Sequence, residues 1–322
     1  MARVGFRRLL VVVKQTPYEM YSQLKAQGKA PLALRWERLK NRYMIHRECV
    51  ANVQNILEQH SVRYSVVGRE ELDRQHISGA DLVLAVGGDG TVLSASHFLD
   101  DSTPLLGINS DPGKEEDKQV IKKADERRSF GALCMCSADN MHEILPRVLH
   151  REVEPSYRTR IQTVIRSTFT ETKLPPALND ILVAHPIPAA VSRFRLGFLN
   201  GSGLEEMEHF SFNVWSSGIW FSTATGSSAV MRAAGGEVME PLSRELQYMV
   251  REHLVEEGMD HLRDESHGMV SEGSRVRIRW NSQFGNIYVD GAHAVHKLQL
   301  GDEIELNAGS PLWLFCSDKQ RF

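Results

Sequence analysis

Three short clusters of glycine, hydroxyl and carboxyl or amide residues are the places in this sequence where chemistry could occur. They are Gly87-Gly88-Asp89-Gly90-Thr91, Asn179-Asp180, and the stretch from Thr223 to Ala229. Glycine lets a backbone approach a ligand closely, and free N–H groups at the start of a helix bind phosphate. Asp89 is the unusual member, because a carboxylate repels phosphate. Its presence indicates either a metal ion or a proton transfer.

The first cluster follows residues 81–86, of which five are apolar and two are β-branched, as is typical of a strand buried on both faces. We expect Gly87, Gly88 and Gly90 to adopt positive φ in the turn, and a helix to continue over 92–99. A tight turn without a ligand is the alternative for this sequence in isolation. The buried strand before it and the Thr91 hydroxyl at the helix start favour an anion site.

The second and third clusters also have structural alternatives. Asn179-Asp180 interrupts an apolar segment, either as a hydrogen-bonded pair at a strand edge or as a contact to a ribose or a base. Thr223 to Ala229 either caps the helix expected over 226–234 or binds an anion at its start. We expect Trp215 and Trp220, which have strand spacing, to lie in the core rather than to form a stacking platform.

The composition is that of an ordinary globular protein, with 42% hydrophobic and 25% charged residues. A length of 322 residues exceeds what one core usually holds, so we expect two domains. The formal net charge of -3 creates no general field for nucleic acid or anionic lipid, and we expect neither as a partner.

Targeting and metal signals are weak. No run approaches the roughly 18 apolar residues that a membrane span needs, so we expect no membrane association and a cytoplasmic protein. Gln320-Arg321-Phe322 is a distant match to a peroxisomal signal, which is the alternative. Cys134 and Cys136 are separated by one residue rather than the two of a zinc knuckle, and the histidines lack ligand spacing. We therefore expect no resident metal site.

The first part of the chain alternates strands with helices, as in an open parallel α/β sheet. Strands are expected over 9–13, 61–67, 81–86 and 104–109, helices over 34–57 and 138–150, and an irregular segment over 14–31. The strand that ends at Asn109 should place it beside the glycine turn, at the edge where such sheets bind ligands. The charged segment 110–130 is either a solvated loop or a lid.

From residue 158 onward the sequence has the alternation of antiparallel strands with one wet face. Strands are expected over 160–169, 177–184, 191–199, 209–215, 218–222, 275–280, 286–289, 303–306 and 312–315. We therefore expect an α/β domain over residues 1–137, followed by a mostly antiparallel β domain over residues 138–322.

The three clusters, in this order, resemble the NAD kinase family, whose relatives with Gly-Gly-Asp-Gly include lipid kinases and phosphofructokinases. The resemblance covers residues 9–315, and two segments, 97–112 and 177–194, are most similar to the plant NADH kinase branch. It implies an N-terminal Rossmann-like domain with a parallel sheet, an all-β C-terminal domain, and ATP with Mg²⁺ carried by the nucleotide. We also expect a homodimer or a higher homo-oligomer.

The resemblance also implies roles for individual residues. Asp89 would be the general base that takes the proton from the adenosine ribose 2′-hydroxyl, a contribution worth about 10² to 10⁴ in rate. Asn179, with Asp180 in place of the family's Glu, would contact the ribose or adenine. The nucleotide-binding set is completed by Gly87, Gly88, Gly90, Thr91, Asn109, Thr223, Gly226, Ser227, Ser228 and Ala229. The aromatic residue that ends the family's third motif is Val230 here.

Ser217 stands six residues before Thr223, where family members usually carry an Asp near the nicotinamide. Removing that anion relaxes a preference for the cationic, oxidised ring. We therefore expect a kinase for NADH and, to a lesser degree, NAD+. The alternatives are a lipid kinase of the same superfamily, which the second and third clusters disfavour, and a nucleotide-sensing protein with a dead site, which Asp89 disfavours.

Overall fold

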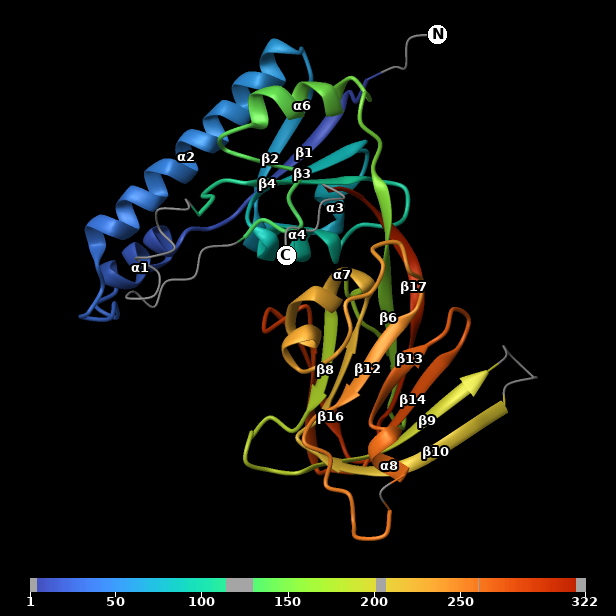
Figure 1. The fold of residues 1–322 in the computed structure, drawn as a ribbon. Helices are drawn as coiled ribbons and strands as arrows, with labels where there is room; N and C mark the ends of the chain where they lie inside the picture. The colour runs from blue at the N-terminus through green and yellow to red at the C-terminus, as the bar shows by residue number, and fades with distance from the viewer. Residues whose placement is uncertain (1–4, 114–129, 201–206, 260, 317–322) are drawn as a thin grey trace. The chain divides into compact units, whose positions relative to one another are not determined.

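The computed structural model describes residues 5–113, 130–200, 207–259 and 261–316 (Figure 1). The chain forms two compact units, one of residues 1–156 with 313–322 and one of residues 157–312. Each unit has its own hydrophobic core. In the part of the chain that is described, no helix has the length and apolar character needed to cross a bilayer.

The first unit contains a parallel sheet in the order β4-β3-β1-β2, as the sequence predicts. Two further segments pair in parallel with β4, namely the short β5 and the last residues of β17. The strands are β1 (Arg8–Val13), β2 (Arg63–Gly68), β3 (Leu82–Gly87), β4 (Leu105–Asn109), β5 (Cys136–Ser137) and β17 (Glu303–Phe315).

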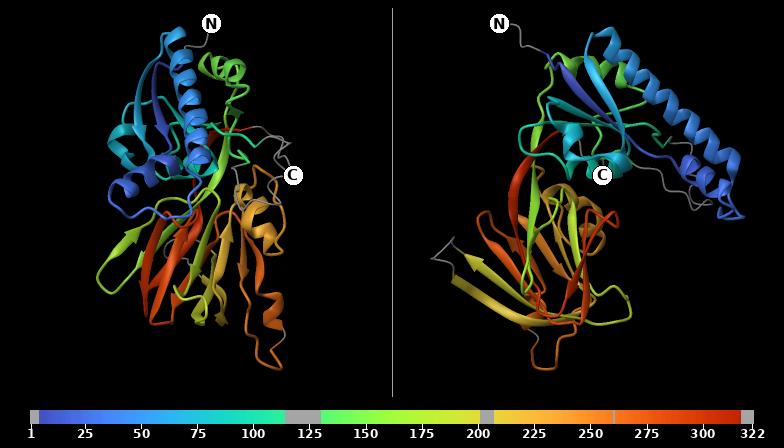
Figure 2. Two further views of the ribbon diagram at one scale, coloured as in Figure 1. Left: turned by 90° about the vertical axis from the view of Figure 1, so that its left-hand side faces the viewer. Right: turned by 180° about the vertical axis from the view of Figure 1, so that it is seen from behind.

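Helices cover this sheet. Apolar residues of α2 and α6, including Val53 and Leu145, share one core with alternate residues of β1 and β3, and Figures 1 and 2 show the long α2 lying against the strands. Thr91 of α4 packs against Gly87 on the other face. The helices are α1 (Pro17–Ala26), α2 (Trp36–Gln59), η1 (Arg69–Glu71), α3 (Arg74–Ile77), α4 (Asp89–Ser96) and α6 (Met141–Leu149).

The prediction of an irregular segment over 14–31 is wrong, because it contains α1. Thr16 is the N-cap of this helix, and its backbone N–H donates to Glu19 Oε2 over 2.8 Å. Glu19 N–H in turn donates to Thr16 Oγ1 over 3.4 Å, which completes a capping box. Pro17 occupies the first helical position, where its missing N–H costs nothing.

The second unit packs two antiparallel layers around one core, as expected for a β domain. One layer runs β10-β9-β14-β17, with β6 beside β17 and β7 beside β6, and the other runs β13-β12-β11-β8-β15-β16. Its strands are β6 (Ser156–Arg166), β7 (Glu171–Lys173), β8 (Asp180–Ala184), β9 (Ser192–Asn200), β10 (Met207–Ser216), β11 (Ile219–Ser222), β12 (Leu246–Val250), β13 (His267–Val270), β14 (Arg275–Trp280), β15 (Phe284–Val289) and β16 (Ala294–Gln299).

Several boundaries differ from the sequence-based ones. β17 is one strand where two were expected, and β12, β13 and β16 were not expected. The first unit extends to residue 156, beyond the sequence-based boundary at residue 137, because α6 buries its apolar face in the first core. The described residues of the second unit include the short helical segments α7 (Ala224–Gly226), η3 (Ser227–Met231) and α8 (His261–Asp264).

The prediction that Trp215 lies in the core is wrong, since 52% of its surface is exposed. β10 is the last strand of its layer, and alternation turns Val214 inward and Trp215 outward. Trp220 is partly buried, with the Arg251 guanidinium 5.9 Å from its ring centre. Most of the charged segment 110–130 and the whole of Gln320–Phe322 lie outside the described residues.

Candidate functional site

The first cluster lies where the sequence predicts it, between a fully buried strand and the start of a helix. Gly87 ends β3 and pairs with Asn109 at the end of β4. Asp89 begins α4, and Gly88 is its N-cap, with no side-chain cap. The end of β3 and the N–H groups of the first turn of α4 therefore meet at the carboxyl edge of the parallel sheet.

The expectation of positive φ for Gly87, Gly88 and Gly90 is wrong, because none of them adopts it. Gly87 is instead required by packing, since a Cβ there would overlap with the Thr91 hydroxyl. At Gly90, apart from its chain neighbours and the backbone of its own helix, no described atom lies within 4 Å of the position that a Cβ would occupy. Gly90 thus leaves open space over the first turn of α4, as close approach of a ligand to backbone requires.

Both carboxylate oxygens of Asp89 accept backbone hydrogen bonds. Leu133 N–H donates to Oδ1 over 2.9 Å, and Gly131 N–H donates to Oδ2 over 3.1 Å. The place of Asp89 at the start of α4 also stabilises negative charge. Asp89 is therefore held as an oriented carboxylate at the glycine turn.

Asn109 is buried, and its amide packs against Gly131, one of the two residues that donate hydrogen bonds to Asp89. Its Oδ1 accepts from Asp111 N–H over 3.3 Å, so the amide organises the turn after β4. The next residue, Ser110, donates its N–H to the Gly87 carbonyl over 2.8 Å and contacts His46 Nδ1 over 2.8 Å. The end of β4 thus fixes the last residue of β3.

The second cluster is held by a residue that sequence reasoning missed. The Asp290 carboxylate accepts the backbone N–H groups of Leu178 (2.9 Å), Asn179 (2.7 Å) and Asp180 (3.1 Å). Asp290 follows β15 with φ of 51°, a left-handed conformation that Asp tolerates better than most residues. The Asp290-Gly291 pair after an apolar strand marks a turn in the sequence, but not this contact across 110 positions.

Asn179 and Asp180 themselves combine burial with unsatisfied polar groups. Asn179 Oδ1 is buried and accepts no hydrogen bond from the described residues. Asp180 is 8% exposed, and burial, followed by repulsion from Asp290, raises the pKa of its carboxyl to about 7. A buried acceptor and a carboxyl poised near neutrality are typical of a site that binds a polar ligand.

The third cluster divides into capping residues and exposed ones. Thr223 is the buried N-cap of α7, and its hydroxyl donates to the Leu178 carbonyl over 2.6 Å and accepts from Gly226 N–H over 3.2 Å. Ser227 Oγ donates to the Ala224 carbonyl over 2.7 Å and accepts from Met239 N–H. Ser228 and Ala229 are exposed. The helix-capping interpretation thus accounts for two of the hydroxyls.

The second and third clusters lie together. The Asn179 carbonyl accepts from Thr223 N–H over 2.9 Å, and a Cβ on Gly226 would overlap with that same carbonyl. Thr225, which is not among the predicted site residues, has a buried hydroxyl without a hydrogen-bond partner in the described chain. Asn179, Thr225 and Asp180 therefore bring unpaired or titrating oxygens to one region of the second unit.

Ser217 lies apart from this region. β11 pairs with β8 so that Ser222 faces Asp180 and Ile219 faces Val183, which places Ser217 beyond the opposite end of β11 from Thr223. Six extended residues span about 20 Å. One ligand would reach both Ser217 and Asn179 only if it were elongated along β11.

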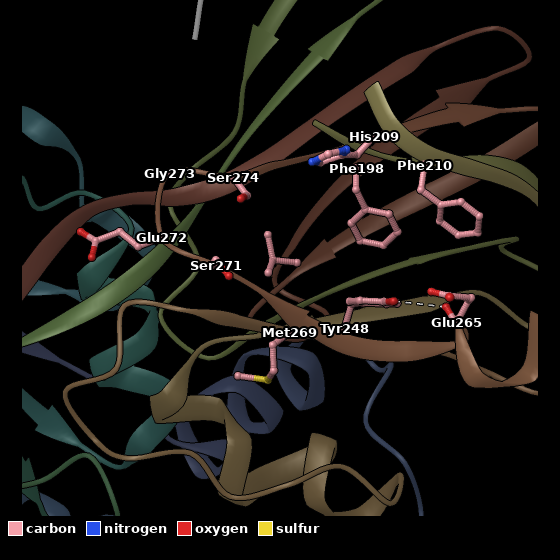
Figure 3. Close-up of a pocket in the computed structure, with 11 residues that line it drawn as sticks. Phe198, His209, Phe210, Tyr248, Glu265, Met269, Ser271, Glu272, Gly273 and Ser274 are labelled. Carbon is pink, nitrogen blue, oxygen red and sulfur yellow. Dashed lines mark hydrogen bonds between the residues drawn. The ribbon is translucent and has the colours of Figure 1, made fainter. Parts of the chain in front are cut away.

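A cavity of about 710 Å³ opens elsewhere in the second unit, and no predicted site residue is among the described residues that line it. Figure 3 shows the rings of Phe198, Phe210 and Tyr248 around it. The Tyr248 hydroxyl donates to the Glu265 backbone carbonyl over 3.2 Å. Across the described ranges, no three His, Cys, Asp or Glu side chains are grouped to hold a metal ion.

Comparisons with known proteins agree with this arrangement. The model for the ATP-NAD kinase N-terminal domain matches residues 13–114, which contain the glycine turn. A probable NADH kinase of Oryza sativa subsp. japonica is 39% identical over 275 residues, covering 85% of this chain and 82% of the relative. The NADH kinase of Arabidopsis thaliana is 38% identical over 314 residues, covering 96% and 95%.

The chain belongs to the NAD kinase family. One plant relative is named an NADH kinase and the other a probable NADH kinase, which confirms the predicted resemblance to that branch. Solved structures of the NAD kinase family share the fold. They include an NAD kinase from Archaeoglobus fulgidus in complex with ATP (TM-score 0.64, 19% identity, 98% of this chain and 95% of that one) and yeast NADH kinase complexed with NADH (TM-score 0.63, 16% identity, 98% and 86%). The predicted fold class is confirmed.

Proposed function

We propose that this protein is an ATP-dependent kinase that phosphorylates the adenosine ribose 2′-hydroxyl of NADH, and less efficiently that of NAD+. The observation that carries the proposal is the oriented Asp89 carboxylate at the glycine turn of a chain that is similar to plant NADH kinases along most of its length. The products are NADPH and NADP+.

In this proposal Asp89 is the general base that accepts the proton of the 2′-hydroxyl as it attacks the γ-phosphorus of ATP. The phosphoryl group passes to the ribose oxygen, and ADP leaves. The N–H groups of the first turn of α4 and the open space at Gly90 suit the phosphates. Mg²⁺ arrives with ATP and neutralises phosphate charge there.

The dinucleotide is assigned to the second unit. Asn179 Oδ1 and the Thr225 hydroxyl have no hydrogen-bond partner among the described residues, and the Asp180 carboxyl has a raised pKa. These polar groups could bind a ribose and an adenine. We further propose a homodimer or a higher homo-oligomer and a cytoplasmic location, as the sequence leads us to expect.

Ser217→Asp should move the substrate preference toward NAD+. A carboxylate at this partly buried position attracts the cationic oxidised ring, and an exposed or half-exposed charge pair is worth about 1 kcal/mol, or roughly fivefold in kcat/KM. The measurement is the NADH/NAD+ ratio of kcat/KM values. Ser271→Asp, the same change at an exposed site, serves as the control and should leave the ratio unchanged. An unaltered ratio in Ser217→Asp would remove Ser217 from substrate selection.

The direct test of the proposed function is to incubate the protein with MgATP and either NADH or NAD+, and to measure NADPH or NADP+. We expect product with both, more with NADH, and none when excess EDTA removes Mg²⁺. Product with NAD+ alone would contradict the stated preference. Tight nucleotide binding without any product would favour the sensing protein, and phosphorylation of a lipid alcohol instead would favour the lipid kinase.

A further inference from the structure

Lys14 lies directly at the glycine turn. It follows the last residue of β1, and its backbone N–H donates to the Val86 carbonyl over 3.1 Å, one residue before Gly87. A Cβ built on Gly87 would stand 3.2 Å from Lys14 Cβ. The lysine side chain therefore leaves the backbone on the carboxyl edge of the parallel sheet, beside the turn that precedes α4.

No described acidic side chain pairs with the Lys14 ammonium at this edge of the sheet. It makes no hydrogen bond or ion pair with any side chain that the structure describes. The carboxylate that acts on its charge, Asp111, is engaged by another cation, since Asp111 Oδ2 accepts from Arg42 Nε over 2.8 Å. Arg69, a second cation that acts on Lys14, is itself paired with Glu70 over 2.6 Å.

The remaining neighbours do not compensate the charge. Glu19 accepts both the N–H and the hydroxyl of Thr16 in the capping box, each over 2.8 Å. His46 is fully buried, and burial, followed by repulsion from Lys14, lowers its pKa to about 4, so the imidazole is neutral at pH 7. Burial also lowers the pKa of Lys14, which Asp111 only partly opposes. A partly buried ammonium without a partner is unfavourable unless an anion joins it.

We propose that the Lys14 ammonium binds the terminal phosphates of the nucleoside triphosphate donor at the glycine turn. The inference deepens the proposed function and rests on it for the identity of the donor. Lys14 stands at the end of β1 and the N–H groups of α4 at the end of β3, so an anion at the turn would meet a charge and a set of dipoles together.

The donor is favoured over the dinucleotide because of where the unsatisfied groups lie. The polar groups suited to a ribose and an adenine, Asn179, Thr225 and Asp180, all belong to the second unit. At the glycine turn, the first unit offers glycines, helix N–H groups and the Lys14 ammonium, which suit phosphates rather than a base. Lys14 is therefore assigned to the phosphates of ATP and not to the adenosine of NADH.

The test compares wild type with Lys14→Met, which keeps the aliphatic length and removes the charge. Binding of MgATP, inorganic tripolyphosphate and NADH is measured by calorimetry, and the melting temperature of the free protein is recorded. We expect Lys14→Met to bind MgATP and tripolyphosphate roughly tenfold to a hundredfold more weakly, the loss of one charge-assisted hydrogen bond, with NADH affinity unchanged. The free variant should melt no lower than wild type, because an unpaired charge is gone.

Two further variants sharpen the comparison. Lys14→Arg retains a cation and should keep more MgATP affinity than Lys14→Met. Lys40→Met is the matched control, since Lys40 is exposed on α2 in the same unit, and it should bind all three probes as wild type does. In turnover assays Lys14→Met should raise the KM for ATP and leave the KM for NADH unchanged.

The outcomes separate this inference from the proposed function. If wild type makes NADPH and Lys14→Met keeps the wild-type affinity and KM for ATP, the Lys14 assignment is wrong and the kinase stands. If the variant loses NADH and MgATP affinity equally and melts lower, Lys14 is structural. If wild type binds MgATP and tripolyphosphate through Lys14 but makes no product, the kinase proposal is wrong and the Lys14 assignment stands. Failure of wild type to bind MgATP or tripolyphosphate overturns both.

Discussion

Asp89→Asn is expected to lower kcat for NADH phosphorylation by about 10² to 10⁴, the usual contribution of a general base. The amide is nearly the same size as the carboxylate, but it cannot accept the proton of the ribose hydroxyl. The measurement is kcat at saturating MgATP and NADH. Asp101→Asn, the same change at an exposed site in the first unit, should leave kcat unchanged.

The lower kcat of Asp89→Asn could also have a structural cause, because Asp89 accepts two backbone hydrogen bonds. Gly131 and Leu133 both donate N–H groups to the carboxylate, so an amide NH₂ would face one donor with another. Losing one such bond costs roughly 1–3 kcal/mol of stability. We therefore expect Asp89→Asn to melt lower as well. MgATP binding decides between the two roles, because a lost base leaves that affinity intact.

Asp89→Glu provides the complementary variant. It retains a carboxylate but moves it by one methylene, which disturbs the bonds to residues 131 and 133. If Asp89 acts as a base, Asp89→Glu should keep more activity than Asp89→Asn. Equal loss in both variants, together with equal loss of MgATP affinity, would assign Asp89 to the support of residues 131–133 instead. Full activity in Asp89→Asn would refute the assigned base.

Asp180→Asn is expected to stabilise the protein at pH 8 by up to about 4 kcal/mol and to have little effect at pH 4. The folded-state pKa of Asp180 is about 7 against an ordinary value of 3.8. The folded protein thus holds this proton more tightly than the unfolded chain does. Between these two pKa values, unfolding releases a proton, and the free energy of unfolding falls as the pH rises.

Denaturant unfolding at several pH values between 4 and 8 measures this effect. The wild type should lose stability across that range relative to Asp180→Asn, and the difference should level off above pH 7. Asp264→Asn, an exposed site in the second unit, should follow the wild type. A constant difference at all pH values would mean that burial and Asp290 do not raise the pKa of Asp180.

The local part of the first site could be predicted from the sequence, because strand, glycine turn and helix are adjacent in the chain. Even there, the reason for the glycines was wrong. Their φ values are ordinary, and what requires Gly87 is contact with Thr91. The capping box of α1 was present in the sequence as Thr16-Pro17-Tyr18-Glu19 and shows that local signals can be missed.

The supports of the sites could not be predicted, because they come from distant positions. Asp290 binds the backbone at Leu178–Asp180 from 110 or more residues away, and residues 131 and 133 bind Asp89 across more than 40. No periodicity or turn rule links such positions. The edge position of β10 likewise decided that Trp215 is exposed, and strand order is a property of the whole fold.

The last residues of β17 have a consequence for how the chain is made. Leu314 and Phe315 pair with Leu105 and Leu106, and the Phe315 ring lies 6.3 Å from that of Phe6. A nascent chain that has left the ribosome only as far as residue 156 therefore lacks a strand and a core aromatic of its first unit. Until residue 315 emerges, part of β4 offers unpaired N–H and C=O groups. The first unit, whose synthesis begins first, is thus completed only after the second unit has been translated.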